Sequence, residues 1–146
     1  MPPHPLAEQL ASLLSSTSRT WRGKMDERLK PLGLSQAKWL VLYALSVGSE
    51  GGSQKDLAER IGIEGPTLVG LLDRLAADGW IERRESTADR RIKTVHLLPK
   101  ADQALSQIHA VAVALRHELL ADVSAKDLEI CMTTLEKIKH KLETLP

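Results

Sequence analysis

The stretch from Ser53 to Leu98 constrains the fold of this chain more than any other part of its 146 residues. Two short segments with apolar stripes come first, separated by glycine and proline, and a basic segment between two β-prone runs follows. This order predicts a helix, a tight turn, a second helix and a charged wing. Such an arrangement lays one helix in a DNA major groove.

The first of these helices is predicted to begin at Ser53 and to end at Gly62. Ser53 and Asp56 have the S-x-x-D spacing in which the serine side chain accepts a hydrogen bond from an otherwise unpaired backbone N–H. The apolar stripe of the helix consists of Leu57, Ala58 and Ile61. Glycine suits the end of the helix because a left-handed backbone costs it little.

The second helix is predicted to begin at Gly65-Pro66, because the missing N–H of proline has no intrahelical partner in the first turn. Its buried stripe consists of Leu68, Leu71, Leu72 and Leu75. Small and hydrogen-bonding residues lie outside that stripe, as base-edge contact in the major groove requires. We expect the DNA contacts of this helix to come from Gly65, Pro66, Thr67, Val69, Gly70 and Arg74.

Gly79 closes the second helix, and two β-prone runs, 80–84 and 92–97, then predict a hairpin. The second run alternates apolar Ile92 and polar Lys93, with Val95 and Leu97 then on one side. Residues 83–100 contain six Lys or Arg and two Asp or Glu, so basic charge is concentrated here. An arginine-tipped wing suits the narrow, electronegative minor groove. The expected DNA contacts of the wing are Arg83, Arg84, Asp89, Arg90 and Arg91.

Long helices are predicted on both sides of this module. Leu6 to about Lys30 has a helical apolar period, and Ser35 caps a further helix that is apolar nearly all round and therefore central. Gly48 to Gly52 reads as a flexible turn. After Pro99 two segments have heptad-like spacing, one through Leu105, Ile108, Ala112, Leu115 and Leu119, the other through Leu128, Cys131, Leu135, Ile138, Leu142 and Leu145.

A monomer has little to cover these stripes, so we expect a two-fold homodimer in which both chain ends interlock. An intrachain helical pair is the alternative. The predicted fold is mainly α with a small β-hairpin wing. It comprises an N-terminal dimerisation helix (1–33), a winged helix-turn-helix DNA-binding domain (34–99) and C-terminal dimerisation helices (100–146).

The composition excludes several classes of function. No apolar run approaches the roughly 20 residues of a membrane span, and no export signal is evident, so we expect a cytoplasmic protein without membrane contact. The single Cys131 fits a reducing compartment. It is expected to be a buried structural thiol, with a redox switch as the alternative. The five histidines show no metal spacing, so no metal site is predicted. No nucleophile elbow, phosphate loop or carboxylate dyad indicates catalysis, and no cofactor is expected.

The run from Gln54 to Leu98 resembles the winged helix-turn-helix of MarR-family transcriptional regulators. Residues 62–69 and Asp89-Arg90-Arg91 are similar to the SlyA-like branch, and the resemblance extends to residues 13–36. In that family the aspartate matching Asp89 braces the arginine matching Arg91, which enters the minor groove. Gly70 departs from the pattern, because SlyA-like proteins usually carry a long basic residue there. Leu98 also replaces a frequent threonine.

The resemblance implies a dimeric regulator that recognises a palindromic promoter site in double-stranded DNA, as a repressor or an activator. It also implies a cleft for small aromatic carboxylates, lined by residues matching Arg19, Arg22 and Trp39, with Tyr43 one helical turn beyond. The alternative interpretation is that Trp39 and Tyr43 are core residues without a ligand, and that Arg19 and Arg22 are solvated.

An alternative function is a winged-helix module that binds protein without sequence-specific DNA binding, because fold alone does not decide between the two. Such a module would predict a wing without net basic charge, whereas this wing is basic.

Overall fold

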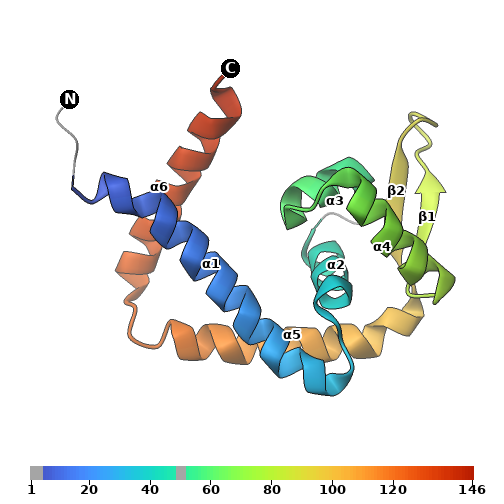
Figure 1. Ribbon diagram of the computed structural model, residues 1–146, viewed down its shortest axis with the longest axis horizontal. Helices are drawn as coiled ribbons and strands as arrows, with labels where there is room; N and C mark the ends of the chain where they lie inside the picture. Colours follow the sequence, from blue (N-terminus) through green and yellow to red (C-terminus); the bar gives the residue numbers. More distant parts are fainter. Residues whose placement is uncertain (1–4, 49–51) are drawn as a thin grey trace. The chain divides into compact units, whose positions relative to one another are not determined.

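The computed structural model describes residues 5–48 and 52–146. Within them the chain is mainly helical with one two-stranded β-hairpin (Figure 1), which confirms the predicted fold class. The elements in order are α1 (Ala7–Leu29), η1 (Lys30–Leu32), α2 (Gln36–Val47), α3 (Gln54–Ile61), α4 (Gly65–Ala77), β1 (Ile81–Glu85), β2 (Lys93–Leu97), η2 (Pro99–Ala101), α5 (Asp102–Leu119) and α6 (Ala125–Thr144).

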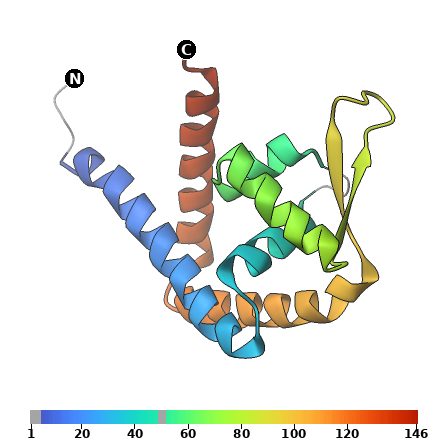
Figure 2. The same ribbon diagram turned by 45° about the vertical axis from the view of Figure 1, so that its right-hand side comes forward.

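The chain divides into two compact units, Met1–Val113 and Ala114–Pro146. The core of the first unit gathers around α2, which contacts α3, α4 and β2 (Figure 2). On α2 itself Val41 and Leu42 are fully buried, which confirms that this helix is central. Its neighbours contribute the buried side chains of Leu29, Leu57, Ile61, Leu68, Leu72, Leu75, Ile81, Val95 and Ile108.

The local signals that start and stop the helices act as the sequence predicts. The Ser53 hydroxyl oxygen accepts a hydrogen bond from the backbone N–H of Asp56 at 3.1 Å, and Ser35 does the same for Lys38 at 3.4 Å. Gly62 adopts the left-handed backbone, with φ of 77°, and α4 begins at Gly65 with proline in its first turn. The serine caps define where α2 and α3 begin, whereas Gly62 and the proline-started first turn of α4 shape the tight turn between α3 and α4.

The hairpin pairs β1 and β2 antiparallel, with Ile81 opposite Leu97 and Glu85 opposite Lys93. The segment before α3 joins this pairing, since the backbone N–H of Val95 donates to the Gly52 carbonyl at 3.1 Å. β2 begins at Lys93, one residue later than the predicted run. Ile92 lies in the turn before it, where its backbone N–H donates to the Asp89 carbonyl at 3.0 Å, and its side chain is 42% exposed.

Part of the expected heptad stripes is covered within the chain. On α5, Ile108 and Ala112 are buried, whereas Leu105 is half-buried and Leu119 is exposed. Part of the apolar stripe of α5 is therefore buried within the chain itself and does not need a second subunit to cover it.

The second unit contains α6, which the Ser124 hydroxyl caps by accepting from the backbone N–H of Asp127 at 3.1 Å. No residue of α6 is buried, and Leu128, Ile130, Met132 and Leu142 are exposed. Cys131 is also exposed, so the expected burial of its thiol is wrong for the single chain. The reason is that α6 buries no complete face here.

Most of the predicted turn between Gly48 and Gly52 lies outside the described residues. A search of the described helices finds no span that is long and apolar enough to cross a bilayer.

Candidate nucleic-acid interface

Helix α4 packs one face against the core and exposes the other face to solvent. Leu68, Leu72 and Leu75 are buried, which anchors the helix by its apolar stripe. All six residues predicted to meet the major groove are exposed, namely Gly65, Pro66, Thr67, Val69, Gly70 and Arg74. Leu71, the remaining residue of the predicted stripe, is half-buried, so the sequence period and the observed burial agree along this helix except at that position.

A groove of about 580 Å³ runs between α3 and the start of α4. Its lining residues are Gln54, Lys55, Ala58, Glu59, Gly62, Ile63, Glu64, Gly65, Leu68 and Val69. The groove exists because Gly62 turns the chain sharply between the two helices. The first turn of α4 therefore borders a recess instead of a flat surface.

At the wing tip, Asp89 holds Arg91 in a fixed orientation. Asp89 Oδ1 accepts from the Arg91 backbone N–H at 3.0 Å and from Arg91 Nε at 3.1 Å, while Asp89 Oδ2 accepts from Arg91 Nη2 at 3.0 Å. The side chain of Arg91 nevertheless remains 90% exposed. A braced, solvated guanidinium is thus presented outward, as insertion into a groove requires.

The same contacts keep both groups charged. The side-chain hydrogen bond from Arg91, aided by the backbone N–H, holds the pKa of the Asp89 carboxyl below its ordinary value. The hydrogen bond to Asp89 raises the pKa of the Arg91 guanidinium. The wing tip therefore presents a permanent cation.

Two further wing arginines are already paired within the chain. Arg83 Nη2 lies 2.5 Å from Asp73 Oδ1, which ties the hairpin to α4. Arg84 Nη2 lies 2.9 Å from Glu82 Oε2, and this contact with Arg84 lowers the pKa of the Glu82 carboxyl. Arg90 is exposed, and its side chain has no ion pair with the described residues. The arginines predicted together for the wing thus have different local environments.

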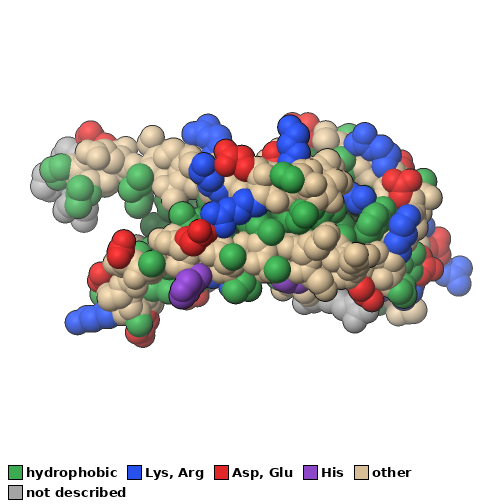
Figure 3. Space-filling model, turned by 90° about the horizontal axis from the view of Figure 1, so that it is seen from below, with side chains coloured by type: hydrophobic (Ala, Val, Ile, Leu, Met, Phe, Trp, Pro, Cys, Tyr) green, Lys and Arg blue, Asp and Glu red, His purple; other side chains and the backbone are tan. Residues whose placement is uncertain are grey.

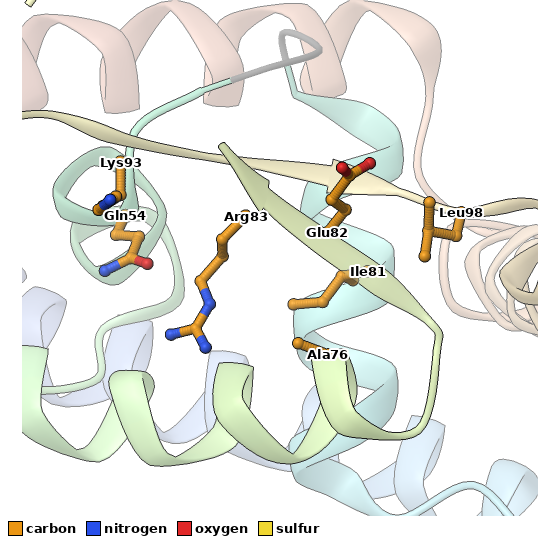
Figure 4. Close-up of a pocket in the computed structure, with 7 residues that line it drawn as sticks. All are labelled: Gln54, Ala76, Ile81, Glu82, Arg83, Lys93 and Leu98. Carbon is orange, nitrogen blue, oxygen red and sulfur yellow. The ribbon is translucent and has the colours of Figure 1, made fainter. Parts of the chain in front are cut away.

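A second pocket, of about 660 Å³, lies between the hairpin, α3 and α4 (Figure 4) and is lined by Gln54, Ala76, Ile81, Glu82, Arg83, Lys93 and Leu98. The Gln54 Oε1 atom is buried and has no hydrogen-bond partner among the described residues. Sequence patterns gave no signal for this pocket, because its lining comes from α3, α4 and both strands.

The four residues expected to line an effector cleft lie on α1 and α2. Trp39 is 4% exposed, and its Nε1–H donates to Asp26 Oδ1 at 3.3 Å. The Tyr43 ring lies 5.5 Å from the His109 ring, whereas Arg19 is exposed and Arg22 half-buried. Neither pocket described above is lined by any of the four. A cleft at these residues stays a prediction.

Trp80 is a contact site that sequence patterns missed. The Lys38 ammonium lies 3.8 Å from the centre of one of its rings and the Lys100 ammonium 5.0 Å. Lys100 Nζ also donates to the Asp78 carbonyl at the end of α4. These cation–π contacts join α2, the end of α4 and η2.

Charges on the surface are mixed. The face shown in Figure 3 carries Lys and Arg side chains interspersed with Asp and Glu, in keeping with a net charge of +1. Among the residues that the structure describes, no three His, Cys, Asp or Glu side chains form a group that could hold a metal ion.

The two capped helices, the anchored α4 and the arginine-tipped hairpin together define a winged helix-turn-helix. A family model described as "MarR family" matches residues 32–92. The crystal structure of transcriptional regulator PA3341 is 40% identical, with 93% of this chain and 99% of that chain covered and a TM-score of 0.86. The protein belongs to the MarR family of DNA-binding transcriptional regulators, which confirms the family resemblance.

Two structures of the repressor CouR have the same fold at 24% identity. One, bound to a 23-mer DNA duplex, matches with a TM-score of 0.70 over 92% of this chain and 94% of that chain. The other, from Rhodococcus jostii RHA1 and bound to p-coumaroyl-CoA, matches with a TM-score of 0.75 over 93% and 95%.

Proposed function

We propose that the protein is a homodimeric, SlyA-like regulator that recognises a palindromic promoter site. The observation that carries this proposal is the pairing of an exposed α4 face with an exposed Arg91 braced by Asp89. One element suits the major groove and the other the minor groove. A relative of the same fold, CouR, is bound to a DNA duplex, which supports this use of the fold.

In this proposal residues 34–99 bind DNA, while residues 1–33 and 100–146 form the dimer. The DNA-contacting residues are Gly65, Pro66, Thr67, Val69, Gly70, Arg74, Arg83, Arg84, Asp89, Arg90 and Arg91. Exposed apolar side chains at Leu10 and Leu13 of α1, and at Leu128 and Leu142 of α6, support a partner subunit, since a monomer leaves them in water. Two subunits related by a two-fold axis match a palindrome.

The test is binding of the purified protein to its own upstream DNA, before and after Arg91→Ala. Because the Arg91 side chain is 90% exposed, its removal should leave the fold and the dimer intact while specific binding is lost. Lys126→Ala, an exposed change on α6, is the matched control and should bind as the original does. Unchanged binding by Arg91→Ala would remove the wing from the mechanism.

We further propose that a small aromatic carboxylate regulates binding at Arg19, Arg22, Trp39 and Tyr43. An arginine fork holds a carboxylate while an indole covers a ring. Because Trp39 is 4% exposed, its side chain must move to meet a ligand. Salicylate should release DNA from the original protein and not from Arg22→Ala. Equal release from both would place the effector elsewhere.

The alternative, a winged-helix module that binds only protein, has less support, because the family consists of DNA-binding regulators. Absence of preference for any duplex at physiological salt would favour it.

A further inference from the structure

The exposed face of α4 carries no Lys or Arg from Gly65 to Gly70. The first charged residue before this segment is Glu64, at the N-cap, and the first basic residue after it is Arg74. The commonest specific contact in the major groove is an arginine or lysine on guanine, and it needs a long basic side chain near the helix start. This part of α4 cannot make that contact.

An apolar contact is available in its place. Val69 is 41% exposed and borders the groove between α3 and α4, whose lining also includes Ala58, Ile63 and Leu68. Along the base edges of the major groove, the group that such a surface can recognise is the C5-methyl of thymine. Thr67, also exposed, offers a methyl group together with a hydroxyl.

Gly70 has no side chain that would hold the backbone of α4 away from the DNA bases. A Cβ built there would meet no heavy atom within 4 Å, so the packing of the chain itself does not require glycine. Its φ is not positive either, and glycine destabilises a helix interior relative to alanine. Pro66 and Gly70 are one helical turn apart, so they form a strip beside Val69 in which only the compact proline ring stands above the helix backbone. Such a strip allows the helix backbone to lie against base edges.

We propose that α4 reads its operator through apolar contact with thymine methyl groups, made by Val69 and Thr67, with the backbone at Gly70 in close approach. Charged contacts then come from Arg74 to phosphate and from Arg91 in the minor groove. This inference rests on the proposed function and names the class of DNA sequence that it requires, one with thymine at fixed major-groove positions.

The first test begins with selection of bound duplexes from a random pool, followed by replacement of each selected thymine with deoxyuridine. Loss of one contacted methyl should weaken binding about fourfold per half-site, the equivalent of about 0.8 kcal/mol. In Val69→Ala the same replacement should have a smaller effect, because the contact is already gone. If no thymine methyl matters in a selected operator, the inference fails. If no duplex is selected, the proposed function fails.

The second test measures Gly70→Ala on the selected operator and on a duplex of unrelated sequence. The variant should melt at a higher temperature than the original protein, since alanine favours a helix and the added Cβ meets no atom within 4 Å. It should lose operator affinity by several-fold, because its methyl group separates the helix from the bases, while its binding to the unrelated duplex should stay the same. Operator affinity equal to that of the original protein would exclude close approach at Gly70.

Discussion

Arg91 donates three hydrogen bonds to Asp89, two from its guanidinium and one from its backbone N–H, and its side chain is still 90% exposed. The two residues are only two positions apart, so the wing tip forms this brace without help from the rest of the fold. An arginine fixed before binding loses less conformational freedom on entering a groove. The contact with Asp89 therefore orients the Arg91 guanidinium and leaves its positive charge exposed for binding.

Asp89→Asn tests that role while the Arg91 cation is retained. Asparagine removes the charged, two-oxygen acceptor and loosens Arg91, whose cation remains. We expect operator affinity to fall about tenfold, because fixing a long side chain costs about 1–2 kcal/mol. The measurement is fluorescence anisotropy over a range of salt concentrations, and the salt slope should stay unchanged. If Asp89→Asn reduced the salt slope as much as Arg91→Ala does, Asp89 would do more than orient the Arg91 guanidinium.

The pH dependence of the brace follows from the lowered pKa of Asp89. A carboxyl whose pKa lies below its ordinary value of 3.8 in the folded state contributes stability above that value, and the contribution is lost as the pH falls through the lowered pKa. The brace should thus be unaffected between about pH 5 and about pH 8. A carboxyl ¹³C titration should give a midpoint under 3.8 for Asp89. In Arg91→Ala the midpoint should rise, and a titration identical in both proteins would contradict the assigned cause.

Ser53→Ala should destabilise the first unit by about 1 kcal/mol, since it leaves the backbone N–H of Asp56 without its cap. Thermal or urea unfolding measures the change. Ser53→Asp is the control, because a carboxylate can accept the same hydrogen bond and should restore most of the stability. Equal losses in both variants would show that the site depends on the serine for another reason.

Leu13→Glu or Leu142→Glu should weaken the proposed dimer, since both leucine side chains are more than half exposed on helices that the proposal assigns to the partner contact. Sedimentation should show dissociation at concentrations where the original protein is dimeric. Val47→Glu, an equally exposed apolar position on α2, should leave the oligomer unchanged. A monomeric original protein would refute the dimer.

Local signals account for what the sequence predicted well. Ser53 caps its helix through a residue three positions away, and Gly62 ends that helix by its own backbone freedom. The spacing of Leu68, Leu72 and Leu75 sets which face of α4 is buried, so its exposed face follows from the same period. Each depends on neighbours within a few residues.

Only the tertiary structure decided contacts between distant residues. It paired Arg83 with Asp73 and joined the buried Trp39 to Asp26 by a hydrogen bond. It left Cys131 exposed. It also brought Gln54 into a pocket with residues of α4 and both strands. Sequence period reports which face of an element is apolar, but it does not report which other element covers that face. The sequence therefore determined the elements and the wing tip, and packing determined the partners of the remaining side chains.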